Sequence, residues 1–181
     1  KSCFFVMYIY MSVVNKIEFT HILTATAFIE VYILYLFRFT NSIITGVLVN
    51  EWYNKFRWSA VALDISSIMI GFYLAKFMFP HSNKLLSRFI HNDMLVFLIT
   101  VLIIQIIHDV LFWLIALRTH MNKGTRTDNA VLNELIDYAN NVQYGAILGD
   151  SFIYIVATPF LFYLLQSNMS NENMQFITIV C

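Results

Sequence analysis

The chain has 181 residues, of which 59% are hydrophobic and 12% are charged. An ordinary soluble domain carries about 25% charged residues. The composition therefore excludes such a domain and predicts an integral membrane protein, with a lipid bilayer as its first partner. Its 11 Lys and Arg residues balance 11 Asp and Glu residues. A chain without excess positive charge lacks the basic surface that attracts nucleic acid, so no nucleic-acid partner is expected.

Four stretches are long and apolar enough to cross a bilayer, which takes about 20 mostly apolar residues. In chain order they are residues 19–37, 58–79, 94–117 and 144–165. Pro80 is expected to end the second span and Pro159 to kink the fourth, because proline lacks an N–H donor and crowds the preceding turn. The sequence predicts an all-α, integral membrane four-helix bundle that forms one transmembrane domain over residues 1–181.

The loops between the spans are expected to contain short interfacial helices. Residues 43–49 are apolar but too few to span a bilayer. In the third loop an amphipathic helical spacing is formed by Val131, Leu132, Leu135, Ile136 and Ala139. Thr127 or Asp128 is in position to cap this helix. Such a helix lies on a membrane surface, docks a partner or packs on its own protein.

Each predicted span carries one acidic residue, and the four acids fall at one depth. We name the end of the bundle with loops 39–57 and 118–143 side B, and the opposite end side A. Counted from side B at ~1.5 Å per residue, the acids lie roughly 9–13 Å below the same surface. On the third span, a glutamine and a histidine share the stripe of the acid. The sequence thus predicts a buried polar layer of Glu30, Asp64, Gln105, His108, Asp109 and Asp150.

Small residues on two of the spans form faces suited to close contact between helices. These helix-packing residues are Ala60, Ser67 and Gly71 on the second span, and Gly145 and Gly149 on the fourth. They lie near the polar layer, so the small and polar faces are both expected to turn inward.

Charge at bilayer depth costs at least ~2.5–3.5 kcal/mol per group, so the layer needs compensation. Three kinds of compensation are open. The acids stay protonated, or basic side chains (Arg38, Arg57 or Arg118) reach in from side B, or a cation or proton occupies the layer. We interpret the layer as a structural, hydrogen-bonded knot between helices. An ion or proton site is the alternative, because intramembrane carboxylates often mark such paths.

The sequence contains no motif that indicates an enzyme. It has no P-loop, nucleophile elbow or H-E-x-x-H motif, and no Glu-x-x-His pair of the kind found in di-metal helix bundles. Cys3 and Cys181 lie far apart, without a Cys-x-x-Cys pair. We therefore expect no catalytic residue, no metal site, no cofactor and no enzymatic activity.

Two stretches, QIIHDVLFW in the third span and DYANNVQYGAILGDSFIYI entering the fourth, resemble small multi-span membrane proteins of nucleocytoplasmic large DNA viruses of algae and amoebae. The resemblance covers residues 58–159. It implies a virion setting, in which the protein is a minor capsid component of the internal membrane, and a host membrane during assembly. It also marks the positions Gln105, His108, Asp109, Gly149, Asp150 and Ser151.

The expected function is that of a structural membrane protein of a giant virus, which anchors the internal membrane to the capsid. Residues 39–57 or 118–143 would contact minor capsid proteins, and oligomers within the membrane are possible. The alternative is an ion or proton conductor that uses Glu30, Asp64, His108, Asp109 and Asp150.

Overall fold

The computed structural model describes residues 13–39, 47–118, 128–142, 144–167 and 169–181. All regular structure in these segments is helical, and they contain no strand. Four long α-helices dominate: α1 (Phe19–Phe39), α3 (Trp58–Leu86), α4 (Asp93–Phe112) and α7 (Tyr144–Gln166). By length and composition, all four are able to cross a membrane. The all-α prediction and the four apolar helices are therefore confirmed.

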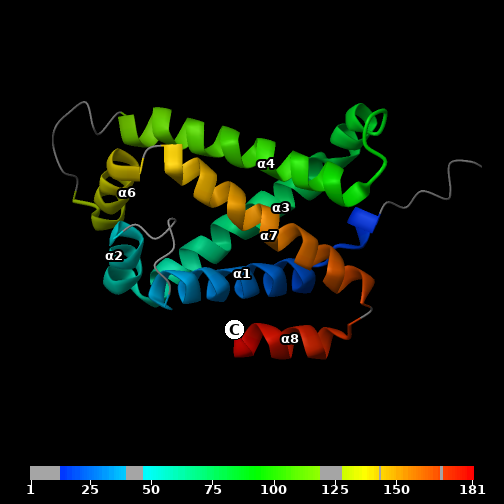
Figure 1. The fold of residues 1–181 in the computed structure, drawn as a ribbon, viewed down its shortest axis with the longest axis horizontal. Coiled ribbons are helices and arrows are strands. Elements are labelled where there is room, and N and C mark those ends of the chain that lie inside the picture. The colour runs from blue at the N-terminus through cyan, green and yellow to red at the C-terminus, as the bar shows by residue number, and fades with distance from the viewer. Residues whose placement is uncertain (1–12, 40–46, 119–127, 143, 168) are drawn as a thin grey trace, which may run out of the picture.

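The four long helices run along the length of the molecule (Figure 1), and their contacts form a closed ring. Helix α1 contacts α3, α3 contacts α4, α4 contacts α7, and α7 returns to α1. Each long helix therefore buries one face against two neighbours, and the opposite face remains outside. A short 3-10 turn, η2 (Val13–Lys16), packs on α3 and α4 at side A.

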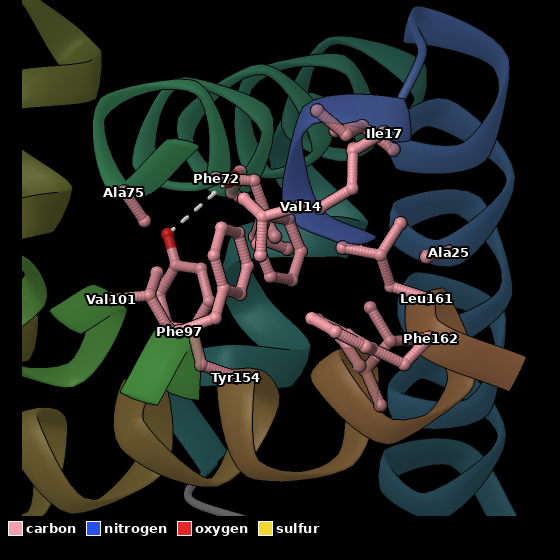
Figure 2. Packing of buried hydrophobic residues seen from close by; sticks show 14 of the residues in the cluster. Val14, Ile17, Ala25, Phe72, Ala75, Phe97, Val101, Tyr154, Leu161 and Phe162 are labelled. Carbon is pink, nitrogen blue, oxygen red and sulfur yellow. Dashed lines mark hydrogen bonds between the residues drawn. The ribbon is translucent and has the colours of Figure 1, made fainter. Parts of the chain in front are cut away.

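Aromatic side chains fill the centre of the ring (Figure 2). Tyr154 of α7 meets Phe72 of α3 edge to face, with ring centroids 5.2 Å apart. Phe72 stacks on Phe97 of α4 at 6.1 Å, and Phe97 also packs against Phe162. The Tyr154 hydroxyl donates a hydrogen bond of 3.4 Å to the Ile68 carbonyl. These aromatic side chains join α3, α4 and α7, and buried residues of α1, including Ala25 and Ile29, belong to the same core.

Helix α3 continues through Pro80 to Leu86, so the prediction that Pro80 ends it is wrong. Proline costs a helix its own N–H bond and crowds the carbonyl four residues earlier. However, its fixed φ is itself helical, and proline within apolar spans is tolerated where neighbouring groups compensate. The residues after Pro80 therefore add almost two further turns at side A. Pro159 also lies inside a continuous helix, α7.

Two short helices lie together at side B, on the left of Figure 1: α2 (Val47–Phe56) and α6 (Ala130–Val142). They contact each other, and an ion pair of 2.6 Å joins Lys55 of α2 to Glu134 of α6. The expectation of helices in these loops is confirmed, although residues 43–46 lie outside the described residues. Asn129 caps α6 in place of the predicted Asp128, since the Asn129 side chain accepts the N–H groups of Val131 and Leu132. The other predicted cap, Thr127, lies outside the described residues.

A further helix, α8 (Asn171–Val180), was not expected from the sequence. Ser170 caps it by accepting the Asn173 N–H group. Helix α8 packs along the side-A half of α1, where the hydroxyls of Thr24 and Thr178 lie 2.9 Å apart. The polar composition of this segment gave no apolar stripe from which to predict a helix. Its contacts with α1 are made by Thr178 and by the buried Met174.

A short π-helical turn, η3 (Trp113–Leu117), extends α4 at side B and contacts α6. The predicted span of residues 94–117 is thus an α-helix whose last turn widens. Such widened turns often lie near functional groups. Here the turn begins four residues after Asp109.

Arg57 alone separates α2 from α3, and its backbone is strained. Its N–H group bonds the Tyr53 carbonyl and its own carbonyl accepts the Ala60 N–H group. Its φ of 49° is the only positive value at a non-glycine residue among the described ranges. Positions of this kind cost about 1–3 kcal/mol, and glycine adopts them without steric penalty.

Replacement of Arg57 with glycine is therefore expected to stabilise the protein. Relief of strain outweighs the flexibility of glycine, for a net gain of about 1 kcal/mol in the free energy of unfolding. Arg57→Ala removes the same side chain but keeps the strain, so it is the matched control and should give no gain. Equal stability of the two variants in detergent unfolding would contradict this explanation.

Candidate functional site

The predicted polar residues gather at the side-B end of the bundle, beneath α2 and α6, in two groups. The first group joins α1, α2 and α3. Glu30 is almost fully buried, and its Oε1 accepts a hydrogen bond of 2.9 Å from the Tyr53 hydroxyl. Asp64 Oδ2 accepts a bond of 3.2 Å from the Trp52 indole N–H. Helix α2 therefore supplies one donor to each of two acids.

The second group joins α4 and α7. The amide nitrogen of Gln105 donates to Asp109 Oδ1 at 2.6 Å and to Asp150 Oδ2 at 3.4 Å. Gln105 is buried, whereas the two carboxylates are partly buried. One amide thus links two acids on neighbouring helices, as the structural interpretation of the layer predicts.

The two groups lie within electrostatic range of each other. Asp150 interacts with both Asp109 and Asp64, and Asp64 interacts with Glu30. The four acids therefore form one connected cluster, which we call the acid cluster. The common depth of these acids below a membrane surface stays a prediction.

Two tyrosines outside the long helices face the acid cluster and stay protonated. Burial, followed by the charges of Asp64 and Glu30, raises the pKa of Tyr53 far above its ordinary value. Burial and the charges of Asp150, Asp109 and Asp64 raise the pKa of Tyr138 to about 12. Both phenols consequently keep their hydrogen and remain potential donors at neutral pH.

His108 differs from the prediction. Its Nδ1 lies 3.2 Å from Asp109 Oδ1, but its side chain is 58% exposed. The ring instead stacks on Phe112, with centroids 6.2 Å apart. His108 lies one residue from Asp109, a rotation of about 100° around the helix, which puts His108 at the edge of the stripe, where packing leaves it exposed. His108 is therefore at the margin of the cluster, not in a buried layer.

The basic residues considered as partners do not take that role where they are described. Arg57 is exposed, and the Arg118 guanidinium lies 5.8 Å from the centre of the Trp113 ring. The side chain of Arg38 lies outside the described residues. Within the described segments, the donors bonded to the acids belong to Trp52, Tyr53, Gln105 and His108.

Of the small residues predicted to pack between helices, some are buried and others are not. Ala60 and Gly71 are buried as predicted. Ser67 is exposed, and a Cβ placed on Gly149 would meet nothing within 4 Å, so neither forms the expected close contact. These two corrections have one cause, because spacing assigns a stripe but not the crossing angle that decides which part of it meets a neighbour. Gly145 is half-buried, and its packing role stays a prediction.

The sequence interpretation missed Trp52, Tyr53 and Tyr138. A signal for each existed. Val49, Trp52, Tyr53 and Phe56 follow the i, i+3, i+4, i+7 spacing of an amphipathic helix. Tyr138 extends the stripe of Val131 and Leu135 by three residues. The indole N–H and the phenol O–H of these residues are hydrogen-bond donors, and on the buried face of a helix they can reach buried acids.

The chemistry open to the acid cluster is limited by its partners. No group of three or more His, Cys, Asp or Glu side chains in the described part of the chain is arranged to hold a metal ion. The other carboxylate oxygen of Asp109, Oδ2, is buried and has no hydrogen-bond donor among the described residues. Each acid of the cluster therefore has at least one donor from the protein, and Asp109 Oδ2 is a fully buried acceptor without one among the described residues.

Comparison with models of protein families, with curated proteins and with solved structures finds no match to this chain.

Proposed function

We propose that the chain is an integral membrane four-helix bundle that acts as a structural anchor. Its four long helices would form the membrane-crossing part. Their outward faces leave many large apolar side chains exposed, including Ile70, Phe77, Ile103, Ile107 and Tyr163. Apolar surface on this scale favours lipid over water. The acids face the interior, where polar contacts join the helices as they do in membrane bundles.

The main support for an anchoring role is that side chains of the same chain bond the acid cluster. Each of three donors bonds an acid on another helix: Tyr53 bonds Glu30, Trp52 bonds Asp64, and Gln105 bonds Asp150. These bonds join α2 to α1 and α3, and α4 to α7, while the packed core holds the two sets together. A rigid bundle of this kind suits a protein that transmits position from a membrane to a partner.

The proposed partner surface is the outer face of α2 and α6 at side B. The resemblance of the chain to membrane proteins of large DNA viruses, together with this face, supports a place in the internal virion membrane. There α2 and α6 would contact minor capsid proteins. The ion pair between Lys55 and Glu134 supports the proposal because it joins the two helices into one face.

A charge reversal on this face tests the anchor. Glu51 lies on α2 and is exposed, so Glu51→Lys should leave the fold intact and lower the amount of protein retained in purified virus particles. Lys84→Glu, a reversal at side A, is the matched control and should not lower it. Cryo-electron density that runs from α2 or α6 into a capsid subunit is expected. A side-B face that meets only solvent in intact particles would overturn the proposal.

A second candidate function, conduction of protons or cations, is favoured by the spare acceptor on Asp109. Intramembrane carboxylates with free acceptors commonly form proton and ion paths. Purified protein in liposomes should then show a flux that Asp109→Asn abolishes while incorporation into particles is unchanged. The anchor predicts no flux from the unaltered protein.

A further inference from the structure

A shallow, widely open cavity of about 360 Å³ lies at side A, far from the acid cluster. It lies where α1 begins and where α7 gives way to α8, at the right of Figure 1. The N-termini of α1 and α8 meet here, since the Thr20 hydroxyl donates to Asn171 Oδ1 at 3.4 Å. The cavity is thus formed by segments that are 150 residues apart in sequence.

Charged groups of both signs line the rim of this cavity. Lys16 supplies an ammonium group and Glu18 a carboxylate, and both side chains are exposed. His21 Nδ1 accepts the Glu18 backbone N–H at 3.2 Å. A neutral imidazole that accepts at Nδ1 carries its hydrogen on Nε2, so His21 adds a donor. The rim therefore has donors for an anion and an acceptor for a cation.

The floor of the cavity is apolar. Leu164 of α7 and Met174 of α8 are each 1% exposed, and Leu165 and Met169 are half-buried beside them. A ligand that fits must combine an ionic head with an apolar body. A free polar metabolite would leave the floor unused, and an aliphatic molecule would leave the rim unpaired.

We propose that this cavity binds the headgroup of a zwitterionic phospholipid. Lys16 and His21 would bond the phosphate, with help from the N-termini of α1 and α8. Glu18 would pair with the ammonium group, and the first acyl carbons would lie along Leu165 and Met169. This inference rests on the proposed membrane function, because only then do the ends of α1 and α7 lie at the level of lipid headgroups.

Native mass spectrometry of the full chain, extracted from vesicles of equal phosphatidylethanolamine and phosphatidylglycerol, tests this site. The unaltered protein should retain phosphatidylethanolamine in preference to phosphatidylglycerol. Glu18→Gln should abolish that preference, because phosphatidylglycerol has no ammonium group. Lys16→Gln should weaken retention of both lipids by about tenfold, the loss expected for one charge-assisted bond. Lys84→Gln, a side-A lysine outside the cavity, is the control and should change neither.

Each alternative result has a definite meaning. Equal retention of the two lipids by the unaltered protein, or an equal effect of Lys84→Gln, would overturn the site. Displacement of lipid by millimolar inorganic phosphate would indicate a free-anion site and would also overturn it. Flotation of the same protein with vesicles separates the two proposals. Failure to insert would contradict the membrane function itself, whereas insertion without lipid preference would contradict only the headgroup site.

Discussion

Gly71→Ala is expected to destabilise the bundle, although alanine is the better helix former. A Cβ at Gly71 would lie 2.1 Å from the hydroxyl oxygen of Tyr154 and 2.8 Å from the ring carbon that carries it. Tyr154 cannot easily retreat, because it is 2% exposed, packs against Phe72 and is bonded to the Ile68 carbonyl. Overpacking of such a site costs about 1–3 kcal/mol, which opposes a gain of about 1 kcal/mol in helix propensity.

Gly149→Ala is the matched control, since it makes the same chemical change on another long helix, α7, at a position where nothing lies within 4 Å of the added Cβ. Gly149→Ala should be stabilised by the higher helix propensity of alanine, without the cost of overpacking. The two variants should therefore differ in free energy of unfolding by about 1–3 kcal/mol. The measurement is equilibrium unfolding in detergent. Adding Tyr154→Phe to Gly71→Ala should recover part of the loss by removing the closest atom. Equal stability of the two glycine variants would mean that α3 and α7 are not in close contact here.

Gln105→Leu is expected to have a large effect because one amide serves two acids. Its loss removes the protein donor of Asp150 and the shorter of the two bonds to Asp109. A buried acceptor left without a donor costs about 1–3 kcal/mol, and more when it is charged. The free energy of unfolding should therefore fall by at least that amount, measured in the same detergent assay.

Thr100→Val is the control for Gln105→Leu. Thr100 is buried on the same helix, but its hydroxyl bonds only the Val96 carbonyl of its own helix, at 2.7 Å. Its removal should cost little because that carbonyl belongs to a helical turn. Combining Gln105→Leu with Asp109→Leu should recover only part of the stability, since apolar replacement of both partners is often neutral but Asp150 still lacks the donor that Gln105 supplied. A stable Gln105→Leu variant would show that the acids need no donor from α4.

The two corrections to the polar and small faces arise from one limit of sequence reasoning. Counting residues predicts depth along a helix accurately, because the rise per residue is constant. That count predicted that Glu30, Asp64, Asp109 and Asp150 lie near the same end of the bundle, where the structure brings them into one cluster. Rotation about the helix axis is less constrained, because a stripe covers a wide arc. His108 and Ser67 lie at the edges of their stripes, so the packing of neighbours placed them outside.

The sequence by itself determined the all-helical class, the four long apolar helices and the amphipathic helix α6. These features follow from local composition and from helical period and rise, which do not depend on neighbours. Only the tertiary structure decided that α2 bonds Glu30 and Asp64, that Gln105 bridges Asp109 and Asp150, and that α8 packs on α1. Those contacts join residues distant in the chain, and they depend on how whole helices cross and which side chains then come within hydrogen-bonding distance.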